Sequence, residues 1–172
     1  MRPVLVVIGG LPGSGKSTVA TALARNTSTP YVRVDRIEQA VVDWTSLDHP
    51  VGPVGYAVAH ALADEQLRLG LDVIVECVNP VAVTRQAWPV TAEAAGAGLV
   101  EVEVVCSDPV EHRRRVEERA TDVTGLVKPT WAEVLARDYE PWDRRRVLVD
   151  TAATSVAAAV RQIASAVDAR RD

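Results

Sequence analysis

The stretch Val4-Leu5-Val6-Val7-Ile8-Gly9-Gly10-Leu11-Pro12-Gly13-Ser14-Gly15-Lys16-Ser17 decides the fold of this 172-residue chain. Its first five residues are aliphatic, as in a strand that is buried on both faces of a sheet. Residues 10–17 then fit the pattern G-x-x-x-x-G-K-[ST], and a helical segment follows directly at 16–25. A strand, a glycine-rich turn and a helix in this order present backbone N–H groups to phosphate oxygens. We therefore expect a nucleotide phosphate site at the start of this helix.

The residue types in the motif match the binding of a nucleoside triphosphate. Glycine permits the left-handed backbone that turns successive N–H groups toward one anion. Lys16 would reach the β- and γ-phosphates of ATP, and the Ser17 hydroxyl would hold Mg²⁺. Lys128 is the chain's only other lysine among 19 basic residues. We expect the nucleotide to contact Gly10, Gly13, Ser14, Gly15, Lys16, Ser17 and Thr18.

The rest of the chain alternates short β-rich runs with longer helical segments. The runs that predict strands are 4–8, 31–34, 73–75, 100–106 and 147–149. The segments that predict helices are 16–25, 36–44, 55–69, 82–95, 109–120, 131–138 and 155–169. This alternation indicates an α/β fold of three layers, in which a five-stranded parallel sheet carries helices on both faces. Since no linker divides the chain, we expect one domain over 1–172.

Composition excludes several classes of protein. The net charge of −4 disfavours a general duplex-DNA binder, which would carry a basic surplus. The longest apolar runs are far too short to span a bilayer, and the N-terminal run is too short for a secretory signal. Two cysteines, Cys77 and Cys106, lie in strand-like runs and are expected to be buried free thiols. We therefore expect a cytoplasmic protein without a membrane segment.

Proteins with this glycine-rich loop include guanine-nucleotide switches, motor-type ATPases and kinases. The N-K-x-D motif that reads guanine does not occur, and the D-x-x-G match at 122–125 follows an arginine-rich helical segment instead of a strand. A motor ATPase would carry a strand ending in Asp-Glu, whereas the third predicted strand is followed by Glu76-Cys77. The kinase class fits best.

Two carboxylates follow predicted strands at the edge where parallel sheets carry their chemistry. Asp35, after the second strand, could orient an acceptor hydroxyl and accept its proton, and it could also cap the helix over 36–44. Glu76, after the third strand, could hold Mg²⁺ through water, shape the acceptor side or cap the strand end. We expect Asp35 to be the general base.

Arginines crowd the helical segment at 109–120. Arg115 and Arg119 are four residues apart, so they share one helix face and could both bind a polyphosphate. Glutamates nearby would also allow an ordinary solvated face with Arg–Glu pairs. Because the chain also carries the phosphate loop, Asp35 and Glu76, phosphate contact is the better interpretation for Arg115 and Arg119.

These motifs, together with Asn79 and Tyr139-Glu140-Pro141, resemble the small P-loop kinases with an AAA-type ATP-binding domain. That group includes the kinase domain of polynucleotide kinase, chloramphenicol phosphotransferase, zeta toxins and gluconate kinase. The resemblance covers residues 4 to about 150. It implies a five-stranded parallel core, an arginine-bearing lid at about 109–140, ATP as donor, Mg²⁺, and an aspartate that activates the acceptor hydroxyl, here Asp35.

Two departures from the group concern its acceptor side. Many relatives have Asp where this chain has Glu76, and the polynucleotide kinases have Arg where it has Glu38. The second departure disfavours recognition of a nucleic-acid 5′ end. We expect the acceptor to contact Asp35, Trp44, Tyr56, Glu76 and Asn79.

Three functions follow from these observations. The first is an ATP- and Mg²⁺-dependent kinase that phosphorylates a hydroxyl of a small molecule. The second is a kinase for 5′-hydroxyl nucleic acids or nucleotides. The third is a regulatory module that binds ATP without phosphoryl transfer. The cluster 144–146, three consecutive arginines, could stack on adenine, bind an anionic substrate or lie on the surface.

Overall fold

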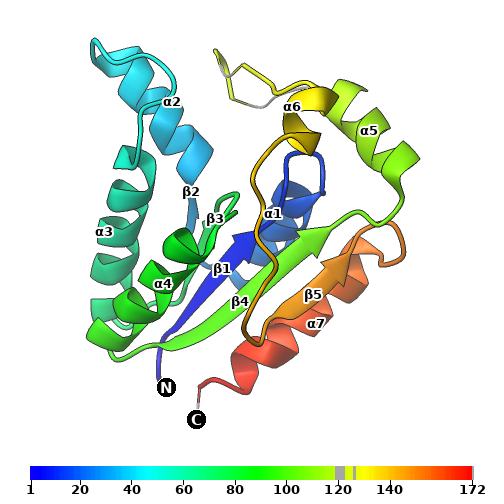
Figure 1. Ribbon diagram of the computed structural model, residues 1–172. Coiled ribbons are helices and arrows are strands. Elements are labelled where there is room, and N and C mark those ends of the chain that lie inside the picture. Colours follow the sequence, from blue (N-terminus) through cyan, green and yellow to red (C-terminus); the bar gives the residue numbers. More distant parts are fainter. Residues whose placement is uncertain (119–122, 126, 172) are drawn as a thin grey trace.

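The computed structural model describes residues 1–118, 123–125 and 127–171, and these contain a five-stranded parallel sheet (Figure 1). The strand order is β2-β3-β1-β4-β5, with β1 at the centre. The strands are β1 (Val4–Gly9), β2 (Tyr31–Arg33), β3 (Val73–Glu76), β4 (Gly98–Val105) and β5 (Val147–Asp150). The predicted five-stranded parallel sheet is confirmed, and each predicted strand overlaps an observed one.

Helices cover both faces of the sheet, as predicted. They are α1 (Lys16–Thr27), α2 (Val34–Trp44), α3 (Val54–Arg68), α4 (Ala82–Ala94), α5 (Pro109–Glu118), α6 (Trp131–Leu135) and α7 (Val156–Asp168). Side chains of β1 alternate between the faces: Val4, Val6 and Ile8 pack with α1 and α7, and Leu5 and Val7 pack with α3 and α4. The continuous aliphatic run of β1 thus reflects a strand buried on both sides.

Helix α2 begins two residues earlier than predicted. Strand β2 ends at Arg33, which is in register with Glu76 of β3, and the helix starts at the next residue. Asp35 therefore lies in the first turn of α2, and the N-cap position belongs to Arg33. The interpretation of Asp35 as a helix cap is wrong, although a carboxylate in the first turn still interacts favourably with the helix dipole.

Within 109–140, the segment predicted as a lid, the structure places α5 and α6. Helix α6 ends at Leu135, three residues before the predicted end, because Arg137 N–H turns back to the carbonyl of Val134. A capping box of Thr130 and Glu133 fixes its start. The predicted end of α5 at residue 120 lies outside the described residues.

One face of β4 is polar, and the chain between α6 and β5 covers it. In register, Glu101 and Glu103 lie beside Val7 and Gly9, so they face the α4 side of the sheet. The segment 139–146 crosses this face (Figure 1), and Tyr139 and Arg146 both donate hydrogen bonds to Glu103. Glu103 is therefore an internal partner of this segment.

Two further expectations are resolved by the fold. Cys77 and Cys106 are both buried and unbridged, as predicted. Among the described helices, not one has the length and apolar character needed to cross a membrane.

Candidate active site

The glycine-rich loop joins β1 to α1 and has the backbone that its sequence predicts. Gly10, Gly13 and Gly15 have φ values of 151°, 81° and 93°, in or near the left-handed region. A Cβ on Gly10 would lie 2.3 Å from the carbonyl oxygen of Val104, so the loop also packs tightly on β4. Gly15 caps α1 without a side-chain hydrogen bond. Backbone N–H groups at the N-terminus of α1 would therefore be the groups that meet an anion there.

A cavity of about 870 Å³ opens beside this loop. Its walls come from the glycine-rich loop and α1, from the end of β3, from the start of α2, and from the 109–140 segment. Of the predicted nucleotide contacts, Gly13, Gly15, Lys16, Ser17, Thr18 and Arg115 line the cavity. Gly10 and Ser14 are not among the lining residues. Ser14 is buried inside the loop, and Gly10 packs against Val104 of β4.

Glu76 is the best-connected carboxylate of the cavity. Its side chain is 3% exposed, and the Ser17 hydroxyl donates a hydrogen bond to its Oε1 at 2.5 Å. The Tyr31 hydroxyl donates to Oε2, and Lys16 Nζ and Arg33 Nε lie 4.0 and 3.7 Å from the carboxylate oxygens. This convergence explains why a carboxylate can be buried at the end of β3.

Ser17 and Glu76 fit the requirements of a magnesium site. Mg²⁺ prefers hard oxygen ligands, and it usually binds one or two protein groups together with phosphate and water. The Ser17 hydroxyl and the Glu76 carboxylate are such oxygens, and they are adjacent. The described residues contain no group of three or more His, Cys, Asp or Glu side chains that could hold a metal. An ion between Ser17 and Glu76 would take its other ligands from phosphate and water.

Asp35 lines the cavity from the first turn of α2, where Arg33 holds its carboxylate. Arg33 Nε and Nη2 donate hydrogen bonds of 3.1 and 2.7 Å to the two carboxylate oxygens. A guanidinium in this two-pronged arrangement fixes the plane of the carboxylate. Arg33 also lies beside Glu76, so one arginine links the predicted base to the predicted metal ligand.

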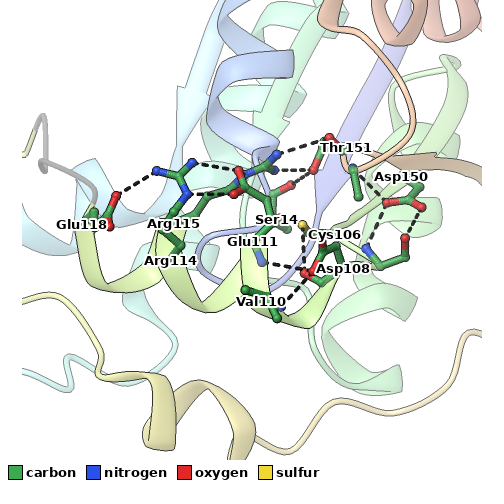
Figure 2. A network of polar contacts seen from close by, with 12 residues as sticks. Ser14, Cys106, Asp108, Val110, Glu111, Arg114, Arg115, Glu118, Asp150 and Thr151 are labelled. Carbon is green, nitrogen blue, oxygen red and sulfur yellow. Dashed lines mark hydrogen bonds and ion pairs between the residues drawn. The ribbon is translucent and has the colours of Figure 1, made fainter.

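Arg115 is held beside the glycine-rich loop by a chain of hydrogen bonds (Figure 2). Its Nη1 donates to Thr151 Oγ1 at 2.7 Å, and the Thr151 hydroxyl donates to the carbonyl oxygen of Ser14 at 2.7 Å. Its Nε pairs with Glu111 at 2.7 Å. Arg115 therefore makes the predicted Arg–Glu pair and also lines the cavity, and its contact with phosphate stays a prediction. Arg119, its predicted partner, lies outside the described residues.

Three of the five predicted acceptor residues line this cavity, namely Asp35, Tyr56 and Glu76. Burial raises the pKa of Tyr56, whose hydroxyl accepts a hydrogen bond from the Asn79 N–H. Asn79 itself is fully buried with a φ of 52°, packs against Gly9 and does not line the cavity. It supports the loop after β3 instead of facing a ligand.

Trp44 does not reach the cavity either, and its side chain is 89% exposed. It is nine residues after Asp35 on α2, which places it about 180° around the helix from the cavity wall. Its indole therefore points away from the wall that carries Asp35.

Four charged residues that line the cavity are absent from the predicted site: Arg25, Arg33, Glu38 and Arg137. Glu38 had a usable signal, since it is three residues after Asp35 and therefore shares its helix face. Thr151 was also missed, because its role depends on the approach of the chain after β5 to Gly15, where a Cβ would lie 3.1 Å from Thr151 Cγ2. No local pattern encodes that approach.

The arginine cluster at 144–146 lies away from the cavity. Arg146 pairs with Glu103, and Arg144 pairs with Asp143. Neither residue is among the cavity's lining residues. For these two arginines, protein-internal and surface ion pairs replace the alternatives of adenine or substrate binding.

Known structures share this fold over nearly the whole chain. A gluconokinase from Sinorhizobium meliloti 1021 is 23% identical with a TM-score of 0.63, over 98% of this chain and 95% of that one. The Mycobacterium tuberculosis APS kinase CysC in complex with AMPPNP and APS is 18% identical with a TM-score of 0.66, over 97% and 98%. Kti12 of Chaetomium thermophilum in complex with ADP-AlF3 is 21% identical with a TM-score of 0.63, over 98% and 99%. These likenesses confirm the P-loop kinase-like fold.

A comparison with curated proteins finds no match. A family model described as an AAA domain matches residues 5–141, which span the sheet from β1 to β4. The matched range includes Lys16, Asp35, Glu76 and Arg115 of the cavity. The chain belongs to the AAA domain family.

Proposed function

We propose that this protein is an ATP-dependent kinase that transfers the γ-phosphoryl group to a hydroxyl of a small molecule. One observation carries the proposal: a single cavity is lined by the phosphate-binding loop, by the Ser17–Glu76 oxygen pair and by the carboxylate of Asp35. A donor site alone would need only the first two. The carboxylate on the α2 wall supplies what an acceptor hydroxyl needs.

Residues of the loop and of β3 would bind the donor. The backbone N–H groups around Gly13 and Gly15 and the Lys16 ammonium hold the phosphates and stabilise the charge that develops during transfer. Ser17 and Glu76 would hold Mg²⁺, which would neutralise negative charge on the phosphates. Arg115, fixed by Thr151 at the edge of the cavity, adds a second positive group.

Asp35 would act on the acceptor. The acceptor oxygen forms a bond to the γ-phosphorus as the bond from that phosphorus to the β,γ-bridging oxygen breaks, and ADP leaves. The hydroxyl proton passes to the Asp35 carboxylate, which Arg33 holds in a fixed plane. Orientation of the hydroxyl is as important as proton transfer, because positioning contributes much of the rate in phosphoryl transfer.

The comparisons support this chemistry without specifying the acceptor. Two of the similar structures are, by their own descriptions, a gluconokinase and an APS kinase, and another holds ADP-AlF3. We also propose a cytoplasmic location, because two buried thiols without a disulfide suit a reducing compartment.

The test is transfer of radiolabelled γ-phosphate from ATP to a panel of sugars, polyols, nucleosides, antibiotics and 5′-hydroxyl oligonucleotides. We expect a labelled small molecule with the wild type and about 10²-fold less of it, or none, with Asp35→Asn. Labelled oligonucleotide as the best product would favour the nucleic-acid kinase, and a salt titration of binding would check it. Nucleotide binding without any labelled acceptor would support the regulatory module and contradict the proposal.

A further inference from the structure

The wall of the cavity that α2 forms, called the acceptor wall below, carries a carboxylate without a partner among the described residues. Glu38 lies on α2 one turn after Asp35, and both residues line the cavity. Arg33 neutralises Asp35 through two hydrogen bonds. Glu38, by contrast, has neither a hydrogen bond nor an ion pair with any residue that the structure describes. The negative charge of this wall is therefore concentrated at Glu38.

The position of Glu38 is fixed by packing against α3. Gly55 is the second residue of that helix, and a Cβ there would lie 2.5 Å from Glu38 Cγ and 2.9 Å from Oε1. The absence of a side chain at Gly55 thus creates the space that the Glu38 carboxyl occupies. A carboxylate that is half-buried, fixed in place and unpaired is prepared for a ligand group that neutralises it.

The charged and titratable groups around Glu38 come from several elements. Asp35 is on its own helix, His49 is on the connection to α3, and Arg137 follows α6. Burial raises the pKa of Glu38, and His49 and Arg137 act in the opposite direction without reaching ion-pair distance. Arg137 has an exposed side chain on the 109–140 segment.

We propose that the acceptor is an amino alcohol, whose ammonium group pairs with Glu38 while its hydroxyl is oriented by Asp35. This inference rests on the proposed kinase function and specifies its substrate class. An ammonium supplies both the charge and the N–H donors that the Glu38 carboxylate lacks. An anionic acceptor would instead place a like charge beside Glu38 and leave that carboxylate unpaired.

Matched acceptors test the class directly. Three skeletons are offered in amine, neutral and carboxylate forms: glucosamine, glucose and gluconate; streptamine, inositol and quinate; serinol, glycerol and glycerate. We expect kcat/KM for amine forms to exceed that of neutral forms by about 10–100-fold, the range of a charge-assisted hydrogen bond. A preference for carboxylate forms, or equal use of amine and neutral forms, overturns the inference and leaves the kinase function intact. Phosphorylation of none of them, with AMPPNP still bound, contradicts the kinase function itself.

Two variants separate the charge of Glu38 from its structural role. Glu38→Gln keeps the shape of the side chain, and we expect it to raise KM for the amine form about tenfold while the neutral form changes less than threefold. Gly55→Ala keeps the carboxylate, favours helix formation and displaces the Glu38 side chain, so we expect the same loss of amine preference. Glu93→Gln, an exposed carboxylate on α4, is the control. Equal losses for amine and neutral forms in Glu38→Gln would overturn the proposal.

Discussion

The cavity has a donor half, formed by the glycine-rich loop, α1 and the end of β3, and an acceptor half, formed by the start of α2. The two halves differ in how their charges are neutralised. In the donor half, Glu76 is surrounded by the Ser17 hydroxyl, the Tyr31 hydroxyl and two positive side chains. In the acceptor half, Glu38 packs against Gly55 and has no hydrogen bond or ion pair among the described residues. The side chains of the donor half therefore hold one another in place without a ligand, whereas we propose that the charge of Glu38 is available to the substrate. We therefore expect single substitutions in the acceptor half to change the choice of acceptor while nucleotide binding is kept.

Lys16→Arg should have the largest effect, because it alters the donor half at its centre. Lys16 is buried and lies 4.0 Å from Glu76, so the longer, planar guanidinium does not fit the space of the ammonium. We expect phosphoryl transfer to fall by about 10³-fold, at the upper end for loss of one charge-stabilising donor. Steady-state ADP formation measures it, and Lys128→Arg, at the only other lysine, is the control. Turnover near that of the wild type would contradict the assigned phosphate site.

Asp35→Asn should lower phosphoryl transfer to the acceptor without abolishing hydrolysis of ATP. We expect transfer to the acceptor to fall by about 10²-fold or more, since the amide cannot accept the hydroxyl proton. Slow hydrolysis of ATP should persist, because the donor half is unchanged. Asp43→Asn, on the same helix, keeps its hydrogen bond with Gln39 and serves as control. Equal loss of hydrolysis and transfer in Asp35→Asn would argue against a role confined to the acceptor.

Glu76→Gln should weaken the use of magnesium. The amide has less negative charge and leaves the Ser17 and Tyr31 hydroxyls with a poorer acceptor. We expect the Mg²⁺ concentration for half-maximal activity to rise by about 10–100-fold. A titration with Mg²⁺ at saturating ATP measures the change. An unchanged requirement would exclude Glu76 as a metal ligand.

Glu38→Gln should have the smallest effect, and it concerns stability. The pKa of Glu38 is raised in the folded protein, so the folded state binds the proton more tightly than the unfolded state. Deprotonation of Glu38 therefore lowers the free energy of unfolding as the pH rises above the usual pKa of glutamate. We expect Glu38→Gln to raise the free energy of unfolding at pH 8 and to have a smaller effect at pH 5, measured by urea denaturation. A variant less stable than the wild type at pH 8 would show that Glu38 has a stabilising partner.

The same contrast explains what the sequence could predict. The donor half follows from local order, because a strand, a glycine-rich turn and a helix are contiguous over residues 4–25. The parallel sheet follows from the alternation of strand and helix patterns. Position along the chain also placed Asp35 and Glu76 at the carboxyl edge of the sheet, and the structure adds that β2 and β3 are adjacent there.

The acceptor half depends on features that no local pattern reveals. Trp44 faces away because α2 is continuous from Val34 to Trp44, which places Trp44 about 180° around the helix from Asp35. Asn79 is buried because the loop after β3 turns under Gly9 with a left-handed residue. Arg137 lines the cavity from the chain that follows α6. The positions of Asn79 and Arg137 depend on how segments far apart in the sequence come together.

The central claim is that phosphoryl transfer, and not hydrolysis alone, takes place in this cavity. ATP with ¹⁸O in its γ-phosphoryl group, incubated with the wild type and the amine acceptors, measures it by mass spectrometry of the products. The account predicts that the label appears in an acceptor ester with the wild type and only in inorganic phosphate with Asp35→Asn. Label found solely in inorganic phosphate, at equal rates for both proteins, would contradict it.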